Sequence, residues 1–207
     1  GREIAGKRTK AGPETPARIG PGRTLILHPA KRITQAEMEE AAALQAIAWK
    51  AEVGLGFSSV VVAKGRTATV GHADGKDTIF CFDAITGAEV WKVVYPQKLD
   101  PKYYEGGPSA TPSIADGRLY FISKQGEVRC LDAATGKEIW LRNIRKEHGV
   151  EEPEWGFAGS PLVQGNVLFL NAGTHGIALN TKDGSPIWSS GKDASGYATP
   201  VSFRFNG

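Results

Sequence analysis

The chain has 207 residues, with 25 Lys or Arg against 22 Asp or Glu, and therefore a formal net charge of +3. A hydrophobic content of 41% argues against a wholly disordered chain. Its apolar runs are far shorter than the roughly 20 residues of a membrane-spanning helix. Two cysteines cannot form the disulfide framework that holds small secreted domains together. We therefore expect a globular protein with no transmembrane segment.

The N-terminal segment, residues 1–45, differs from the rest of the chain. It carries the excess of positive charge, while the remainder is nearly neutral, so a nucleic-acid partner is not expected. Residues 1–29 are rich in Gly, Pro and basic side chains, which predicts a disordered extension. Thr34 to Glu37 resembles a capping box that leads into a helix-forming run, so a short helix over 34–47 is possible. No secretory signal peptide is recognisable.

An internal repeat dominates the rest of the sequence. A ten-residue pattern occurs three times and ends at Trp91, Trp140 and Trp188, which are 49 and 48 residues apart. A second marker, Ser or Thr followed by Pro, recurs at Thr111, Ser160 and Thr199. A period of roughly 20–50 residues indicates a solenoid, a propeller or another repeat array.

Each repeat contains four short segments with the composition or alternation of β-strands. In chain order the predicted strands are 58–63, 67–71, 78–83 and 89–94, then 110–115, 118–123, 127–132 and 137–141, then 160–163, 167–171, 177–180 and 186–189. Residues 46–50 look like the last strand of an earlier unit, and 197–203 open a later one. The predicted fold class is all-β, a β-propeller of four-stranded antiparallel blades over 46–207, with three full blades and two partial ones.

The spacing Asp-x-x-Thr-Gly-x-x-x-Trp at Asp83–Trp91 and Asp132–Trp140 resembles the tryptophan-docking repeat of the pyrroloquinoline-quinone-like (quinoprotein-like) β-propellers. The third copy departs from it, because Asn180 and Asp183 replace the usual Asp and Thr. The resemblance implies that each indole docks onto the neighbouring blade. The residues given this structural role are Asp83, Thr86, Gly87, Trp91, Asp132, Thr135, Gly136, Trp140, Asn180, Gly184 and Trp188.

Members of this family close rings of seven or eight blades, so 207 residues correspond to about half a ring, as in a fragment or a truncated product. We expect the remaining blades, or self-association, to cover the open edges. In a blade, the connections from strand two to three and from one blade to the next share one face, here called the long-loop face. Its candidate binding residues are His72, Tyr103, Tyr104, Glu105, His148, Trp155 and His175. The alternative for Tyr103 and Trp155 is packing over blade junctions.

The family includes alcohol dehydrogenases that bind pyrroloquinoline quinone (PQQ) with calcium and carry a vicinal cysteine pair, which this chain lacks. Cys81 and Cys130 occupy equivalent positions in successive repeats and are expected to be buried free thiols. His72, His148 and His175 come from three separate loops without the spacing of metal ligands. No catalytic or metal-binding residue is predicted.

The expected function is that of a non-catalytic PQQ-like repeat propeller that binds other proteins as a scaffold and needs no cofactor. By resemblance alone, we expect it in the periplasm or elsewhere in the cell envelope. The alternative is a fragment of a PQQ-dependent dehydrogenase-like oxidoreductase, which would bind PQQ with calcium.

Overall fold

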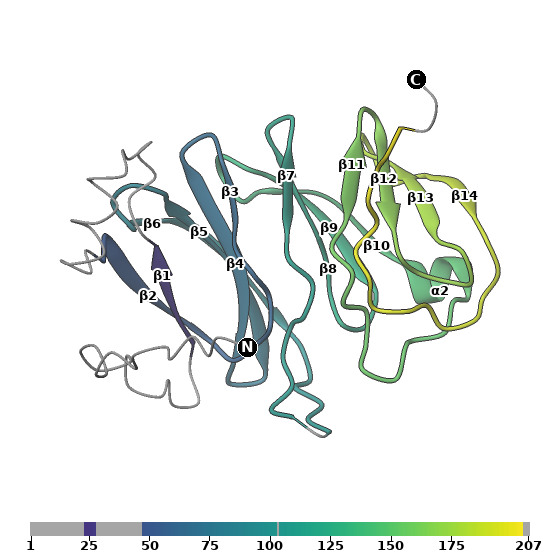
Figure 1. Cartoon of the computed structure of the whole chain (residues 1–207), viewed down its shortest axis with the longest axis horizontal. Coiled ribbons are helices and arrows are strands. Elements are labelled where there is room, and N and C mark those ends of the chain that lie inside the picture. Colours follow the sequence, from purple (N-terminus) through teal and green to yellow (C-terminus); the bar gives the residue numbers. More distant parts are fainter. Residues whose placement is uncertain (1–22, 28–46, 103, 205–207) are drawn as a thin grey trace, which may run out of the picture.

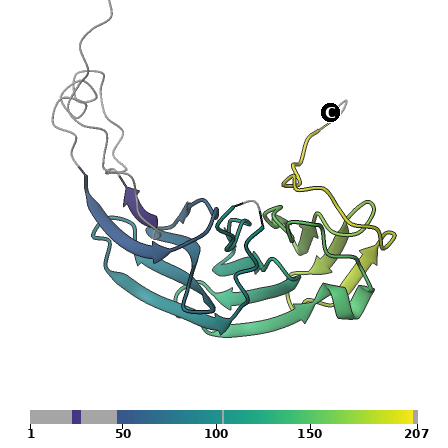
Figure 2. The same cartoon turned by 90° about the horizontal axis from the view of Figure 1, so that it is seen from below.

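The computed structural model describes residues 23–27, 47–102 and 104–204, and it shows antiparallel sheets that follow one another along an arc (Figures 1 and 2). A two-stranded sheet contains β1 (Arg23–Leu27) and β2 (Trp49–Gly54). Blade 1 contains β3 (Val61–Ala63), β4 (Arg66–Ala73), β5 (Lys76–Asp83) and β6 (Glu89–Pro96). Blade 2 contains β7 (Ser113–Ala115), β8 (Arg118–Ile122), β9 (Glu127–Asp132) and β10 (Glu138–Asn143). Blade 3 contains β11 (Leu162–Gln164), β12 (Val167–Leu170), β13 (Ile177–Asn180) and β14 (Pro186–Ser189).

Three four-stranded antiparallel blades confirm the predicted fold class. Their strand order follows the chain, so each blade is a meander that short turns can connect. The predicted bounds of β13 and β14 agree with the structure, whereas β4 runs on to Ala73. It does so because Asp74 and Gly75 both have positive φ (+50° and +71°), the geometry of a two-residue hairpin turn that pairs Ala73 with Lys76.

The N-terminal boundary needs a correction. Residues 23–27 were predicted to be disordered, but they form β1, which pairs antiparallel with β2 from Thr24 opposite Glu52 to Leu27 opposite Trp49. The run from Thr24 to Leu27 consists of β-branched and aliphatic residues, and the free edge of β2 offers it hydrogen-bonding partners. The rest of the predicted extension, and its possible helix up to residue 46, lie outside the described residues.

Two connections also differ from the prediction. The loop after β10 contains a short helix, α2 (Ile144–His148), which the Asn143 side chain caps by accepting a hydrogen bond from the Lys146 amide at 3.0 Å. Gly149 ends α2 in the left-handed conformation. Residues 190–204 contain no strand, although 197–203 were expected to begin one.

Hydrogen bonds of the recurring Ser/Thr-Pro marker connect the segments that lead into the first strand of successive blades. The amide of Ser59 donates to Thr111 Oγ1 at 2.9 Å, and the amide of Thr111 donates to Ser160 Oγ at 2.9 Å. The amide of Ser160 then donates to Thr199 Oγ1 at 3.0 Å. Each of these hydroxyls therefore accepts a hydrogen bond from a backbone amide of the preceding repeat. Thr199 takes part in the same way, although its segment forms no strand.

Within the described residues, no helix is long and apolar enough to cross a membrane. The main hydrophobic core runs through all three blades, and its largest fully buried side chains include Tyr120, Phe121 and Phe157. This shared core holds the connections on the long-loop face in fixed positions.

Candidate functional site

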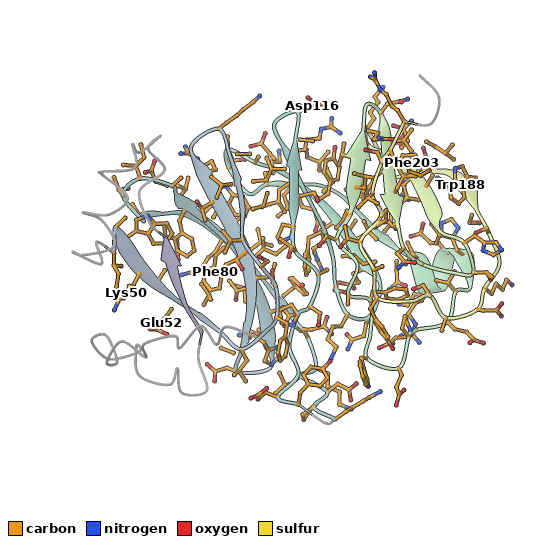
Figure 3. The ribbon with its side chains drawn as sticks, viewed as in Figure 1. Lys50, Glu52, Phe80, Asp116, Trp188 and Phe203 are labelled. Atoms are coloured by element: carbon orange, nitrogen blue, oxygen red, sulfur yellow. The ribbon has the colours of Figure 1, made fainter. Side chains whose placement is uncertain are left out.

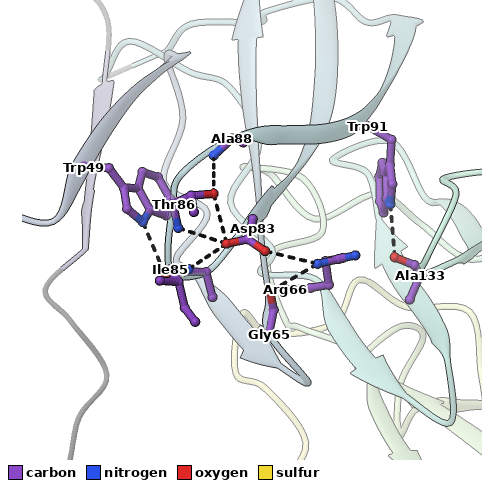
Figure 4. A network of polar contacts seen from close by, with 10 residues as sticks. Trp49, Gly65, Arg66, Asp83, Ile85, Thr86, Ala88, Trp91 and Ala133 are labelled. Atoms are coloured by element: carbon purple, nitrogen blue, oxygen red, sulfur yellow. Dashed lines mark hydrogen bonds and ion pairs between the residues drawn. The ribbon is translucent and has the colours of Figure 1, made fainter.

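The tryptophan-docking motif joins each blade to the next through one hydrogen bond and one close contact. Trp91 Nε1 donates to the Ala133 carbonyl at 3.0 Å (Figure 4), and Trp140 Nε1 donates to the Thr181 carbonyl at 3.0 Å. Each indole also lies against the glycine of the same turn, since a Cβ on Gly136 would stand 2.7 Å from Trp91 Cδ2. Only glycine leaves room for this contact.

The aspartate of the motif holds the turn in the shape that receives the indole. Asp83 Oδ1 accepts hydrogen bonds from the Ile85 amide and from both the amide and the hydroxyl of Thr86 (Figure 4). These bonds, led by the one from the Thr86 amide, hold the pKa of Asp83 below its usual value. Asp132 and Thr135 repeat the arrangement in blade 2.

In blade 3, two side chains accept the hydrogen bonds from turn amides that a single aspartate accepts in blades 1 and 2. Asn180 Oδ1 accepts from the Lys182 amide at 2.9 Å, and Asp183 Oδ1 accepts from the Ser185 amide at 2.9 Å. Gly184 still lies against Trp140, with its hypothetical Cβ 2.8 Å from the Trp140 ring. The departure seen in the sequence therefore leaves the docking geometry intact.

Trp188 differs from the other motif tryptophans. It was predicted to dock on a neighbouring blade, but its side chain is 43% exposed and its ring centroid lies 6.4 Å from that of Phe169 in its own blade. Figure 3 labels Trp188 near the end of the arc that holds β14. Residues 190–204 do not include a further Asp-x-x-Thr-Gly turn that would receive it. Trp188 is thus an undocked member of the repeat within the described part of the chain.

On the long-loop face, four aromatic side chains make a continuous row. Phe57 and Tyr104 meet edge to face with ring centroids 5.1 Å apart, and Tyr104 meets Trp155 in the same way at 6.4 Å. Trp155 stacks on Tyr197 at 5.6 Å. Each residue of this aromatic row comes from a different blade connection. Phe57, Trp155 and Tyr197 remain 42–43% exposed, so the row is a surface feature.

Contacts of the buried residue Lys124 fix two of the connections that carry the aromatic row. The Lys124 ammonium, in a residue that is 4% exposed, donates to the Tyr104 hydroxyl at 3.1 Å and lies 5.2 Å from the Tyr104 ring centre. The Lys124 carbonyl accepts from the Phe157 amide at 2.9 Å, which fixes the loop that carries Trp155. The Lys102 ammonium also donates to the Glu154 carbonyl and so links the two longest connections.

The remaining predicted surface residues are scattered around the row. Glu105 and His175 are exposed, and His148 is half-buried at the end of α2. Tyr103 lies outside the described residues. In the part of the chain that the structure describes, no group of three or more His, Cys, Asp or Glu side chains is placed to hold a metal ion. Cys81 and Cys130 are free and buried, as expected, and burial raises the pKa of each thiol to about 11.

His72 was predicted on the binding surface, and that prediction is wrong. The residue is only 4% exposed, and its Nδ1 lies 2.7 Å from Asp77 Oδ1. The long hairpin places the two side chains opposite each other, because His72 pairs with Asp77 across β4 and β5. The Tyr95 hydroxyl donates a hydrogen bond to Asp77 Oδ2 at 3.4 Å. The Arg129 guanidinium lies over the Tyr95 ring, 4.3 Å from its centroid, in a cation–π contact. His72 therefore belongs to a buried polar network under the face.

This network predicts a pH effect on stability. Burial raises the pKa of the Asp77 carboxyl, although hydrogen bonds from His72 and Tyr95 oppose the shift. The folded state thus binds this proton more tightly than the unfolded state, so the Asp77 contribution is most favourable below a pH of about 4 and declines as pH rises through the raised pKa. Asp77→Asn removes this titration. We expect the free energy of unfolding of the variant, relative to wild type, to rise as the pH increases above about 4 in urea titrations. A difference that does not change with pH would contradict the assignment.

Repeated four-stranded blades, docked indoles and aspartate-capped turns define a PQQ-like β-propeller. A family model described as outer membrane protein assembly factor BamB matches residues 75–204, more than half of the chain. The chain therefore belongs to this family of PQQ-like repeat propellers.

Individual relatives agree with this placement. BamB of Escherichia coli K12 is 30% identical over 92 residues, which cover 44% of this chain and 24% of that protein. A polyvinylalcohol dehydrogenase of a Pseudomonas species is 24% identical over 154 residues, covering 63% and 24%. Among solved structures, a europium-containing methanol dehydrogenase has a TM-score of 0.50 at 17% identity, covering 65% of this chain and 24% of that one, which shows a shared fold. The chain thus spans about a quarter of the length of the curated relatives it matches.

Proposed function

We propose that the chain is a non-catalytic propeller module that binds other proteins through its long-loop face in the cell envelope. The aromatic row carries this proposal, because exposed aromatic side chains on a rigid support are typical of protein-binding surfaces. Phe57, Tyr104, Trp155 and Tyr197 contact one another across four connections, so a partner would meet a preformed surface and order few side chains on binding.

The family supports the kind of partner that we propose. The family model and several relatives carry the name outer membrane protein assembly factor, and this name supports the proposal of a protein partner. By that analogy we propose a periplasmic location and a partner from the envelope. The open ends of the arc would be covered by further blades or by self-association.

The proposal predicts that the double variant Tyr104→Ala/Trp155→Ala loses partner binding while remaining folded. We expect at least about a tenfold loss of affinity, because the loss of even one aromatic anchor commonly costs about 2 kcal/mol or more. Binding of envelope proteins from the source cell to the immobilised chain measures the change. Ile85→Ala is the matched control, since Ile85 is 82% exposed on a β5–β6 turn away from the row. If binding persists in the double variant, or if the variant unfolds, the row packs the loops and does not bind a partner.

A second candidate is a quinone-dependent oxidoreductase, which the similarity to polyvinylalcohol dehydrogenase favours. The residues described do not fit a quinone–calcium site, because they supply no three-ligand group and place Cys81 and Cys130 in different blades. We therefore assign no redox step to them. Adding PQQ with calcium and following dye reduction with alcohols separates the candidates. The scaffold proposal requires no reduction above the protein-free control.

A further inference from the structure

A cavity of about 410 Å³ lies between blades 1 and 2, on the face opposite the long-loop face. The β3–β4 and β7–β8 hairpins and the start of the β9–β10 turn form its wall. Much of this wall is aliphatic, with the side chains of Ala63, Ile114, Ala115, Ala133 and Ala134. The charged side chains on the wall are two basic and two acidic ones, so their sum does not select an ionic ligand from solution.

The next blade junction shows which group can cross such a space in this molecule. Arg66 is the first residue of β4 and Arg118 is the first residue of β8, so the two arginines are equivalent in blades 1 and 2. Each follows a two-residue turn whose glycine has a φ of +74°. Arg118 crosses to blade 3, where its Nη1 donates to the Thr181 carbonyl at 2.6 Å and to the Lys182 carbonyl at 3.2 Å.

Arg66, in contrast, stays on its own blade. Its Nη1 lies 3.4 Å from the Gly65 carbonyl and 3.5 Å from Asp83 Oδ2 (Figure 4). Both contacts are longer than the roughly 2.7–2.9 Å that is usual for charge-assisted hydrogen bonds. The side chains of Arg66 and Asp83 are also 36% and 34% exposed, and ion pairs at such surfaces contribute little to stability. Arg66 is therefore weakly held in this position.

The turn across the cavity has the same acceptor as the turn that receives Arg118. The Ala133 carbonyl accepts from Trp91 Nε1 at 3.0 Å, just as the Thr181 carbonyl accepts from Trp140 Nε1 at 3.0 Å. The Thr181 carbonyl accepts from Arg118 as well, because a carbonyl oxygen has two lone pairs. The equivalent carbonyl in blade 2 can therefore accept a second donor from the side of the cavity.

We propose that Arg66 is an arginine latch between blades 1 and 2. In the open state described here it stays beside Asp83 and the cavity is present. In the closed state its guanidinium enters the cavity and donates to the carbonyls of Ala133 and Ala134, as Arg118 does at the next junction. Salt screens the exposed ion pair of the open state, so a rise in ionic strength favours closing. The inference goes beyond the proposed function, since it concerns the opposite face and involves no partner.

Nuclear magnetic resonance of the ¹⁵N-labelled full chain tests the latch. Spectra are compared at about 0.01 M and about 1 M NaCl, between which the Debye length falls from roughly 30 Å to 3 Å. We expect the Nε–H signal of Arg66 and the amide signals of Ala134 and Thr135 to shift together, because these amides belong to the two peptide groups that gain a donor. The ratio of closed to open state should rise about two- to fivefold. The Nε–H signal of Arg118 should stay in place.

Two variants show whether the shift depends on the latch. Asp83→Asn keeps the Oδ1 atom that accepts from the turn but removes the charge beside Arg66, so its signals at low salt should already lie near the positions seen at high salt. Glu89→Gln is the matched control, because it removes an exposed ion pair with Lys92 in the same blade and should leave these signals unaltered. Arg66→Gln should abolish the effect of salt on the Ala134 and Thr135 amides.

Three results would overturn the inference: no salt-dependent shift of the Ala134 and Thr135 amides, the same shift in Arg66→Gln as in wild type, or equal effects of Asp83→Asn and Glu89→Gln. The salt series uses the wild-type chain, so it remains decisive even if Asp83→Asn loosens the turn. Binding of a partner enters none of these measurements, and failure of the latch is therefore separate from failure of the proposed function.

Discussion

Replacing Gly136 with alanine is expected to lower the free energy of unfolding by about 2–5 kcal/mol. The residue has a φ of +74°, where an L side chain costs about 1–2 kcal/mol, and the new Cβ would stand 2.7 Å from the docked Trp91 ring. Displacing a packed ring adds about 1–3 kcal/mol. Urea titration measures the sum.

Gly117 provides a control with the same backbone geometry. Its φ is also +74°, but a Cβ there would meet no atom within 4 Å. Gly117→Ala should therefore show only the conformational cost of about 1–2 kcal/mol. If the two variants lose the same stability, the contact between Trp91 and Gly136 does not contribute to the docking of blade 1 on blade 2.

Trp140→Ala is expected to destabilise the chain by about 3–5 kcal/mol. Its side chain is 8% exposed, its indole donates to the Thr181 carbonyl, and its removal leaves a cavity between blades 2 and 3. Trp188→Ala removes the same residue type from the same motif position, but that side chain is 43% exposed. It should cost about 1 kcal/mol or less. Equal losses in thermal or urea unfolding would show that interblade docking is not the source of the stability.

Local patterns in the sequence are enough to predict much of the fold, because each blade repeats the same short-range interactions. The turn from Asp132 to Gly136 is closed by bonds within four residues, so its spacing alone predicts its shape. β1 was missed because its partner β2 is distant in the chain and because residues 1–29, which contain β1, have the Gly-, Pro- and Lys/Arg-rich composition of a disordered segment. α2 could have been found from Asn143 and Gly149, which are standard helix-capping residues.

The site was harder to predict, because it depends on contacts between blades. The repeat pattern predicted that Tyr104 and Trp155 lie on loops of one face. Their contacts with Phe57 and Tyr197 could not be predicted, because these depend on how successive blades are arranged in space. The burial of His72 was missed because β4 was predicted to end at residue 71. A two-residue turn at Asp74 and Gly75 would have put His72 opposite Asp77.

The most direct test of a protein-binding long-loop face is site-specific photo-crosslinking in the source cell. A photoreactive phenylalanine analogue replaces Trp155 in one variant and Ile85 in another, and crosslinked protein adducts are compared by mass spectrometry. Both residues are exposed, at 43% and 82%, so accessibility favours the control. A protein-binding long-loop face should give a defined envelope-protein adduct from position 155 and none from position 85. The same adducts from both positions, or an adduct from position 85 alone, would contradict it.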